Sequence, residues 1–263
     1  MPISSIKDIV PHIRAAGLMA LELQRRGALH ASLKADGTIV TQADTQVEDM
    51  LYDKLSTLYP EANILTEETT HAFDPRKRYT FALDPVDGTE VFSRGLAGWC
   101  VALGLLDHSL RPIAGAIYAP CVDIMLVADV GQGVTLNGRP LHPSDQALPL
   151  SENSHLFVTS RIHRLLDLRR FPGKIRSLGS AELHLSLHLL YPDIVAGIQM
   201  PLTHIWDVAA AHALCRAAGL RIEYYDGREI DYSVLVGGGI AEDVLLAGSA
   251  AALQALRASL PRL

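Results

Sequence analysis

The sequence predicts an α/β (α+β) protein in which helices are layered against β-sheets. Three observations indicate this class. The chain opens with two amphipathic segments of helical spacing, its middle contains successive apolar runs typical of strands, and its second half alternates short strands with helices. Such alternation is typical of helices packed on the faces of a sheet.

The N-terminal part of the chain is predicted to form two helices. Apolar residues recur at intervals of three and four over 6–21, and this spacing predicts an amphipathic helix that ends near Gly27. The same spacing over 47–58 predicts a second helix. Asp44 or Thr45 can cap its N-terminus, because short oxygen-bearing side chains accept the unpaired N–H groups there.

The rest of the chain is predicted to be strand-rich at first and then to alternate. A hairpin is expected at Asn137-Gly138, because both residues tolerate the positive φ angles of a two-residue turn. The polar, proline-marked stretch 140–152 indicates a boundary between an N-terminal lobe (1–140) and a C-terminal lobe (141–263). The expected strands are 39–41, 63–65, 79–83, 100–106, 112–118, 123–129, 156–159, 174–177, 194–198, 221–224 and 244–247. The other expected helices are 162–168, 181–190, 206–218 and 249–260.

Composition limits the classes of function. The 263 residues are 49% hydrophobic and carry a formal net charge of -6 without any basic block, which argues against a nucleic-acid-binding protein. Three widely spaced cysteines without a CxxC pair are expected to be buried thiols in a reducing compartment. No signal-peptide pattern and no long apolar stretch is recognisable, so a cytoplasmic location without membrane contact is expected.

The most informative segment is 81–89, where an apolar run ends in Asp84-Pro85-Val86-Asp87-Gly88-Thr89. Carboxylate and carbonyl oxygens are the ligands that Mg²⁺ prefers, and Pro85 stiffens the turn that holds both acids and the Val86 carbonyl. Gly88 lets a phosphate approach the backbone, where N–H groups of the following turn can bind it. The segment indicates metal-assisted phosphate chemistry.

Three further carboxylates are candidates for the same site. Glu67 ends a different expected strand, Asp207 opens an expected helix, and Asp44 is placed to accept a proton through the hydroxyl of Thr89. Each also has an ordinary structural interpretation, which stays open: Glu67 as a solvated loop edge, and Asp44 and Asp207 as helix caps. A calcium loop is disfavoured, because the further acidic positions of an EF-hand are missing.

Four segments, in this order, resemble the inositol monophosphatase superfamily of Mg²⁺-dependent, lithium-sensitive phosphatases. They are Lys34-Ala35-Asp36-Gly37-Thr38-Ile39-Val40-Thr41-Gln42-Ala43-Asp44, Ile64-Leu65-Thr66-Glu67-Glu68, the DPxDGT segment at 84–89 and Ile205-Trp206-Asp207-Val208-Ala209-Ala210. The resemblance covers nearly the whole chain. It implies a layered α-β-α-β-α sandwich, a homodimer, and two or three Mg²⁺ ions between the lobes.

The resemblance also implies roles for single residues. Glu67, Asp84 and the Val86 carbonyl would hold a first metal, and Asp84, Asp87 and Asp207 a second. Glu67 would help to hold the attacking water, which Asp44 and Thr89 would activate. The implied substrate contacts are Val86, Asp87, Gly88, Thr89, Gly179, Ser180, Ala181 and Asp207.

The chain is therefore expected to be a Mg²⁺-dependent phosphomonoesterase that acts on a small phosphorylated metabolite, in the manner of an inositol monophosphatase. Two positions depart from that subfamily: Val91 stands where an Asn is usual, and Met200 where a Glu contacts inositol hydroxyls. A thioether cannot accept two hydrogen bonds from sugar hydroxyls as a carboxylate can. The alternatives are a 3'-phosphoadenosine 5'-phosphate phosphatase and a non-catalytic paralogue that binds a phosphometabolite.

Overall fold

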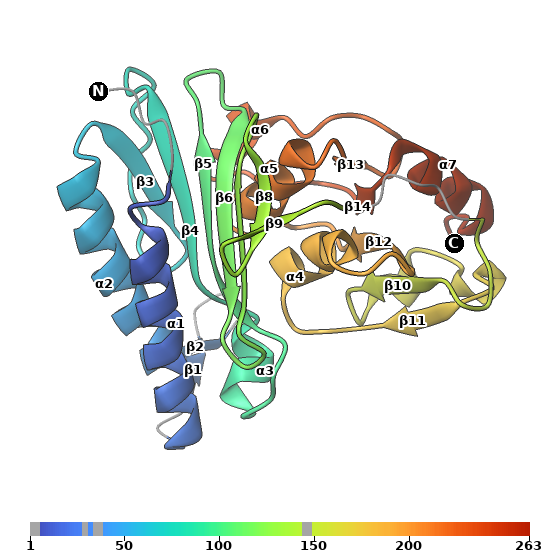
Figure 1. The fold of residues 1–263 in the computed structure, drawn as a ribbon, viewed down its shortest axis with the longest axis horizontal. Coiled ribbons are helices and arrows are strands. Elements are labelled where there is room, and N and C mark those ends of the chain that lie inside the picture. Colours follow the sequence, from blue (N-terminus) through green and yellow to red (C-terminus); the bar gives the residue numbers. More distant parts are fainter. Residues whose placement is uncertain (1–5, 28–30, 34–38, 144–148) are drawn as a thin grey trace.

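The computed structural model describes residues 6–27, 31–33, 39–143 and 149–263, and these form five alternating layers. In Figure 1, α1 and α2 lie at the left against a seven-stranded sheet, and α4 and α5 lie between this sheet and a five-stranded one. Helix α7 packs on the outer face of the second sheet, where its apolar side chains join those of the strands. The predicted α-β-α-β-α sandwich is confirmed.

The outer helices on the N-terminal side are α1 (Val10–Arg25) and α2 (Gln42–Leu58). Their buried apolar faces share one core with the facing side chains of the seven-stranded sheet. The predicted N-cap of α2 is wrong, because the helix begins at Gln42, five residues before the expected start at 47. Thr41 is the N-cap and accepts from the Ala43 N–H, and Asp44 closes a capping box by accepting from the Thr41 N–H.

The seven-stranded sheet has the order β3-β4-β5-β6-β7-β8-β9, and only β3 and β4 run parallel. The expected hairpin is present: Asn137 and Gly138 adopt φ angles of 48° and 78° and join β8 to β9. The strands of this sheet are β3 (Ala62–Thr66), β4 (Tyr79–Asp87), β5 (Cys100–Leu106), β6 (Pro112–Ala119), β7 (Ile124–Asp129), β8 (Gly133–Leu136) and β9 (Arg139–Leu141).

The central layer consists of α4 (Ala181–Ser186), extended by a 3-10 turn over Leu187–Leu189, and α5 (Ala209–Ala217). Helix α5 lies very close to the large sheet. A Cβ at Gly104 would come within 2.5 Å of the Ala209 Cβ. This approach is possible only because small residues face each other across the layer boundary.

The five-stranded sheet has the order β11-β10-β12-β14-β13. Its outer face packs against α7 (Ala250–Ser259) and encloses a separate apolar core. Its strands are β10 (His155–Val158), β11 (Lys174–Arg176), β12 (Ile194–Gln199), β13 (Arg221–Tyr224) and β14 (Leu245–Gly248). Elements that the sequence did not predict are β1 (Ala31–Leu33), which pairs with β2 (Ile39–Thr41), and the short helices α3 (Thr89–Ser93) and α6 (Tyr232–Leu235).

The helix expected over 162–168 is wrong. Two 3-10 turns, Ile162–Arg164 and Leu168–Arg170, take its place. The backbone between them is used elsewhere: the Asp167 N–H donates to the carbonyl of Pro261, and the Asp167 side chain caps the second turn. Contacts with the C-terminal segment therefore override the local helical pattern.

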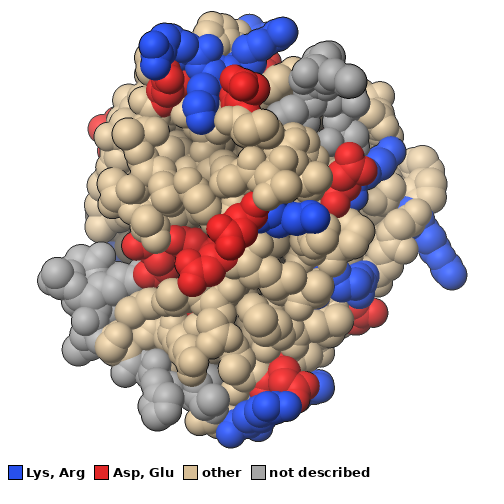
Figure 2. Space-filling view, turned by 90° about the vertical axis from the view of Figure 1, so that its left-hand side faces the viewer, with Lys and Arg blue, Asp and Glu red and all other residues tan. Residues whose placement is uncertain are grey.

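The expected lobe boundary at 140/141 falls within β9 and separates the two sheets. One apolar core nevertheless includes side chains from both sheets and from α4 and α5, so the division into lobes remains an interpretation. Among the described residues, no helix has both the length and the apolar character needed to cross a membrane. On the side where α1 and α2 lie, Figure 2 shows a band of acidic side chains across the middle and small mixed groups of basic and acidic side chains toward the edges.

Candidate active site

A bulge in β4 places Asp84 and Asp87 on the same face of the large sheet. Asp84 pairs with Ala102 and Asp87 with Cys100, so an interval of three residues on β4 faces an interval of two on β5. In a regular strand, side chains three residues apart point to opposite faces. The extra residue of the bulge turns both side chains to the same face. It also leaves a position outside the hydrogen-bond ladder, where Pro85, which has no N–H, can be accommodated. The strand does not end at Leu83, as expected, but continues through the bulge to Asp87.

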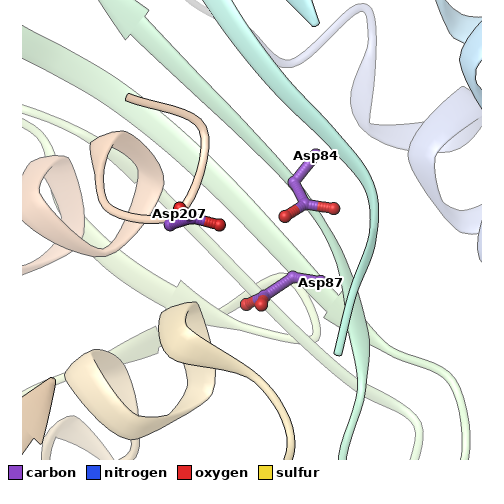
Figure 3. A group of neighbouring side chains, drawn as sticks. All are labelled: Asp84, Asp87 and Asp207. Atoms are coloured by element: carbon purple, nitrogen blue, oxygen red, sulfur yellow. The ribbon is translucent and has the colours of Figure 1, made fainter. Parts of the chain in front are cut away.

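Asp84, Asp87 and Asp207 form a cluster of three carboxylates. Each contributes an oxygen atom that lies within 4.8 Å of the others. Figure 3 shows that Asp84 and Asp87 project from β4 and that Asp207 reaches toward them from the segment before α5. Asp84 and Asp87 are buried and Asp207 is half-buried. Hard oxygen donors at this separation fit a divalent cation such as Mg²⁺.

The electrostatics of the cluster favour a cation. Burial raises the pKa of Asp84 well above its ordinary value, and the charges of Glu67, Asp87, Asp207 and Asp44 raise it further. Glu67 has the largest effect among these charges. It directly follows β3, whose last residue Thr66 pairs with Leu83, so the parallel register carries Glu67 alongside Asp84. The structure thus brings Glu67 to the site, next to the three clustered aspartates.

Asp44 and Thr89 lie in contact at the edge of this cluster. The Thr89 hydroxyl lies 3.0 Å from Asp44 Oδ1 and 3.0 Å from the Val86 carbonyl oxygen. It has one proton, so it donates to one of them at a time. Burial raises the pKa of Asp44, although hydrogen bonds from Thr41 and Thr89 oppose the shift. Asp44 therefore both completes the capping box of α2 and contacts Thr89, so a structural and a catalytic role of this residue are compatible.

Gly88 and Gly179 lie where the two halves of the chain approach each other. Gly88 has a φ of 102°, and a Cβ there would lie 3.2 Å from both the Gly179 carbonyl carbon and the Trp99 Cβ. A Cβ at Gly179 would come within 2.1 Å of the Val91 side chain. The Gly179 N–H donates to the Gly98 carbonyl over 3.1 Å. Both glycines are needed for this close approach.

Asp87 receives hydrogen bonds from the N-terminus of α4. Its oxygens accept from the Ser180 hydroxyl at 2.5 Å, the Ala181 N–H at 3.0 Å and the Glu182 N–H at 2.7 Å. Burial raises the pKa of Asp87, and these hydrogen bonds lower it. The Ser180 hydroxyl and the Ala181 N–H, expected to contact substrate, hold a carboxylate of the site in place.

Glu182 belongs to the surroundings of the site, although no sequence pattern predicted it. Its side chain is fully buried and accepts hydrogen bonds from two N–H groups at the start of α5. Glu182 is the only acidic residue in the otherwise apolar and neutral stretch 181–190. A charged residue within an apolar helix was the signal available, but an acidic residue in a first helical turn has an ordinary explanation as a dipole partner.

The two departures from the inositol monophosphatase pattern occupy different environments. Val91 is half-buried and packs against Gly179, so it contacts the loop that leads to Ser180. Met200 is half-buried against the apolar core of the second sheet. The early segment 34–38, part of the stretch that carries the resemblance, lies outside the described residues.

Comparison with known proteins agrees with the geometry. The model of the inositol monophosphatase family matches residues 9–258. The 3'(2'),5'-bisphosphate nucleotidase CysQ of Shigella flexneri is 31% identical over 210 residues, which cover 76% of this chain and 82% of that protein. Inositol monophosphatase 1 of Solanum lycopersicum is 29% identical over 237 residues, 82% of this chain and 84% of that protein.

Solved structures share the fold. The extragenic suppressor protein SuhB of Bartonella henselae superposes with a TM-score of 0.82 at 24% identity, covering 95% of this chain and 96% of that one. An IMPase/NADP phosphatase complexed with Mg²⁺ and phosphate has a TM-score of 0.78 at 20% identity, with coverages of 95% and 94%. The chain therefore belongs to the inositol monophosphatase family and is a phosphatase of that family.

Proposed function

We propose that this protein is a Mg²⁺-dependent phosphomonoesterase that hydrolyses a small phosphorylated metabolite. The observation that carries the proposal is the group of Asp84, Asp87 and Asp207 with oxygens within 4.8 Å of one another, flanked by the Asp44–Thr89 hydrogen bond. The similarity to a phosphatase that was solved with Mg²⁺ and phosphate supports it.

Five groups would hold the metal ions, two or three per site: the carboxylates of Glu67, Asp84, Asp87 and Asp207 and the carbonyl of Val86. The donor set fits Mg²⁺, because it consists of hard oxygens and because burial, together with the charges of the neighbouring carboxylates, raises the pKa of Asp84, a cost that a bound cation would offset. When bound, the metal supplies a water of lowered pKa and neutralises charge on the phosphoryl oxygens.

The chain itself supplies a path for the proton of the attacking water. Thr89 Oγ1 donates to Asp44 Oδ1. The lone pairs of the Thr89 oxygen are then free to accept a hydrogen bond from a water. As the water oxygen bonds to phosphorus, its proton passes to Thr89 and the Thr89 proton passes to Asp44. The P–O ester bond breaks, and the leaving oxygen takes up a proton from solvent. The raised pKa of Asp44 makes it a better acceptor near neutral pH.

The remaining predicted contacts form the substrate side of the proposal. The N–H groups of Gly88 and Thr89, at the start of α3, would bind phosphate oxygens next to Asp87. Gly179 borders them, and its carbonyl carbon lies 3.2 Å from a Cβ built at Gly88. Ser180 and Ala181 would act on the substrate through their hold on Asp87.

A second candidate substrate is a bisphosphate nucleotide such as 3'-phosphoadenosine 5'-phosphate. Two observations favour it. CysQ proteins, whose name gives this activity, include a relative at 31% identity, and Met200 offers an apolar surface where inositol recognition would use a carboxylate. Without that carboxylate, binding of a polyhydroxylated substrate should be weakened more than binding of an aromatic one.

The test is phosphate release by purified protein from inositol 1-phosphate, 3'-phosphoadenosine 5'-phosphate, fructose 1,6-bisphosphate and histidinol phosphate, each with Mg²⁺. Rapid release from one of them supports the proposal and assigns the substrate. Tight binding of these compounds without turnover would instead identify a non-catalytic paralogue.

A homodimer, inhibition by lithium and a cytoplasmic location complete the proposal. The three free thiols, Cys100, Cys121 and Cys215, support a reducing compartment. Light scattering gives the oligomeric state, and assays at millimolar lithium give the sensitivity of the metal site.

A further inference from the structure

Two buried carboxylates, Asp87 and Glu182, each accept hydrogen bonds from the first N–H groups of a helix. Asp87 accepts from the Ala181 and Glu182 N–H groups of α4. Glu182 in turn accepts from the Ala210 N–H at 3.1 Å and the Ala211 N–H at 2.5 Å, in the first turn of α5. Residue 182 therefore contacts the metal site with its backbone and the next helix with its side chain.

The second of these contacts fixes the segment that carries Asp207. Asp207 lies two residues before α5, and its Oδ2 accepts from the His204 N–H at 2.6 Å in the turn that leads into the helix. The Ala209 N–H closes this turn by donating to the Ile205 carbonyl at 3.0 Å. A displacement of the first turn of α5 along its axis would carry Asp207 with it.

The hydrogen bonds from Glu182 restrain α5 along its axis, in addition to the packing of the helix against the large sheet. The contact of Gly104 with Ala209 sets how closely the helix approaches the large sheet. The free N–H groups of a first helical turn point along the helix axis, so hydrogen bonds to them act along that axis. The Glu182 carboxylate is fully buried, so no water can replace it as acceptor without a rearrangement.

We propose that Glu182 is a positioning residue of the metal site, which holds Asp207 at ligand distance from Asp87 by joining α4 to the first turn of α5. The inference rests on the proposed function, since it assumes that these two aspartates share a metal ion. It assigns to Glu182 no contact with substrate and no proton transfer.

The test compares Mg²⁺ binding by the wild-type protein and by Glu182→Gln, using isothermal titration calorimetry. Glutamine keeps the shape of the side chain but offers one acceptor oxygen, so one α5 N–H loses its partner. We expect Mg²⁺ affinity to fall by about 10- to 100-fold, the usual effect of losing a group that orients a metal ligand. In Glu182→Gln, the rate of phosphate release at saturating Mg²⁺ should change little, whereas the Mg²⁺ concentration that gives half of this rate should rise.

Ser249→Ala is the matched control. Ser249 caps α7 by accepting from the Ala252 N–H at 3.2 Å, on the outer face of the second sheet. Both variants should lose thermal stability, because each leaves an N–H group of a first helical turn without its acceptor, but only Glu182→Gln should lose metal affinity. Wild-type Mg²⁺ affinity in folded Glu182→Gln would reduce Glu182 to a structural cap and overturn the inference.

A measurement on the wild-type protein does not depend on whether the variant folds. Because linkage is reciprocal, Mg²⁺ should slow hydrogen exchange at the Ala210 and Ala211 amides more than at the Ala252 amide. Equal slowing at all three would contradict the inference. Wild-type protein that neither binds Mg²⁺ nor releases phosphate would overturn the proposed function and the inference together. If the wild-type protein turns over normally, then unchanged Mg²⁺ affinity in Glu182→Gln, or equal slowing of exchange at the three amides, overturns the inference alone.

Discussion

Replacing Gly179 with alanine should disturb the site through a single steric contact. The new Cβ would lie 2.1 Å from Val91 Cγ2, whereas ordinary van der Waals contact begins at 3.4 Å. The difference, 3.4 minus 2.1, is 1.3 Å, and Val91 yields little because a β-branched side chain in a helix has one strongly preferred rotamer. Most of the displacement must therefore occur in the loop that contains Gly179.

The expected magnitude follows from this displacement. Overpacking of this kind costs about 1–3 kcal/mol of folding free energy. The loop also carries Ser180, whose hydroxyl binds Asp87, so a shift of this size should lower kcat/KM by up to about 100-fold. Urea unfolding measures the first quantity and phosphate release measures the second.

The double variant Gly179→Ala/Val91→Ala tests the assigned cause. Removing both Val91 methyl groups leaves the Val91 Cβ at 2.9 Å from the new methyl group, so stability and activity should recover in part. Val91→Ala alone serves as the reference. A Gly179→Ala variant of unchanged stability and activity would refute the reasoning, as would a double variant without any recovery.

Three further predictions follow from the hydrogen bonds and charges of the site. Thr89→Ala should lower kcat by about 10²- to 10⁴-fold, the usual range for a lost proton-transfer group, while Thr89→Ser should keep most of the wild-type kcat. Equal kcat values for Thr89→Ala and the wild-type protein in steady-state assays would exclude the Thr89–Asp44 path. Burial lowers the pKa of His184 from 6.5 to about 4, so on acidification the unfolded chain takes up this proton before the folded chain does. The free energy of unfolding should therefore decrease by about 3 kcal/mol as the pH falls from 6.5 toward about 4. Urea unfolding across this pH range should show a smaller loss for His184→Gln, and an identical loss would contradict the assignment. Mg²⁺ at 100 times its dissociation constant should raise the unfolding free energy by about 2.7 kcal/mol, and chelation should remove the gain; thermal unfolding of Asp87→Asn should show no such response, and a wild-type response in that variant would exclude Asp87 as a ligand.

Local sequence patterns predicted most of the fold. The strands of both sheets and the Asn137-Gly138 hairpin depend on alternation and turn chemistry, which neighbouring residues specify. The helix expected over 162–168 failed because contacts with the C-terminal segment, such as the Asp167–Pro261 hydrogen bond, decide the backbone there. Such contacts join residues far apart in the chain, which no local pattern contains.

The candidate site was predictable where its residues lie close together in sequence. The segment from Asp84 to Thr89 contains both a cluster of hard oxygen donors and a glycine, so its chemistry can be inferred without a structure. The bulge that turns Asp84 and Asp87 to one face could not be inferred, because it depends on the register with β5. Glu182 was missed for a similar reason, since its function depends on the α5 amides, 28 and 29 residues further along the chain.

The most direct test of the central claim is phosphate release by the wild-type protein and by Asp84→Asn, each with Mg²⁺ and again after chelation. Asparagine keeps an oxygen that can accept from the Val86 N–H, so the variant should remain folded, as circular dichroism would verify. The metal-centred account predicts release only by the wild-type protein and only with Mg²⁺. Undiminished release by folded Asp84→Asn, or by the chelated wild-type protein, would contradict it.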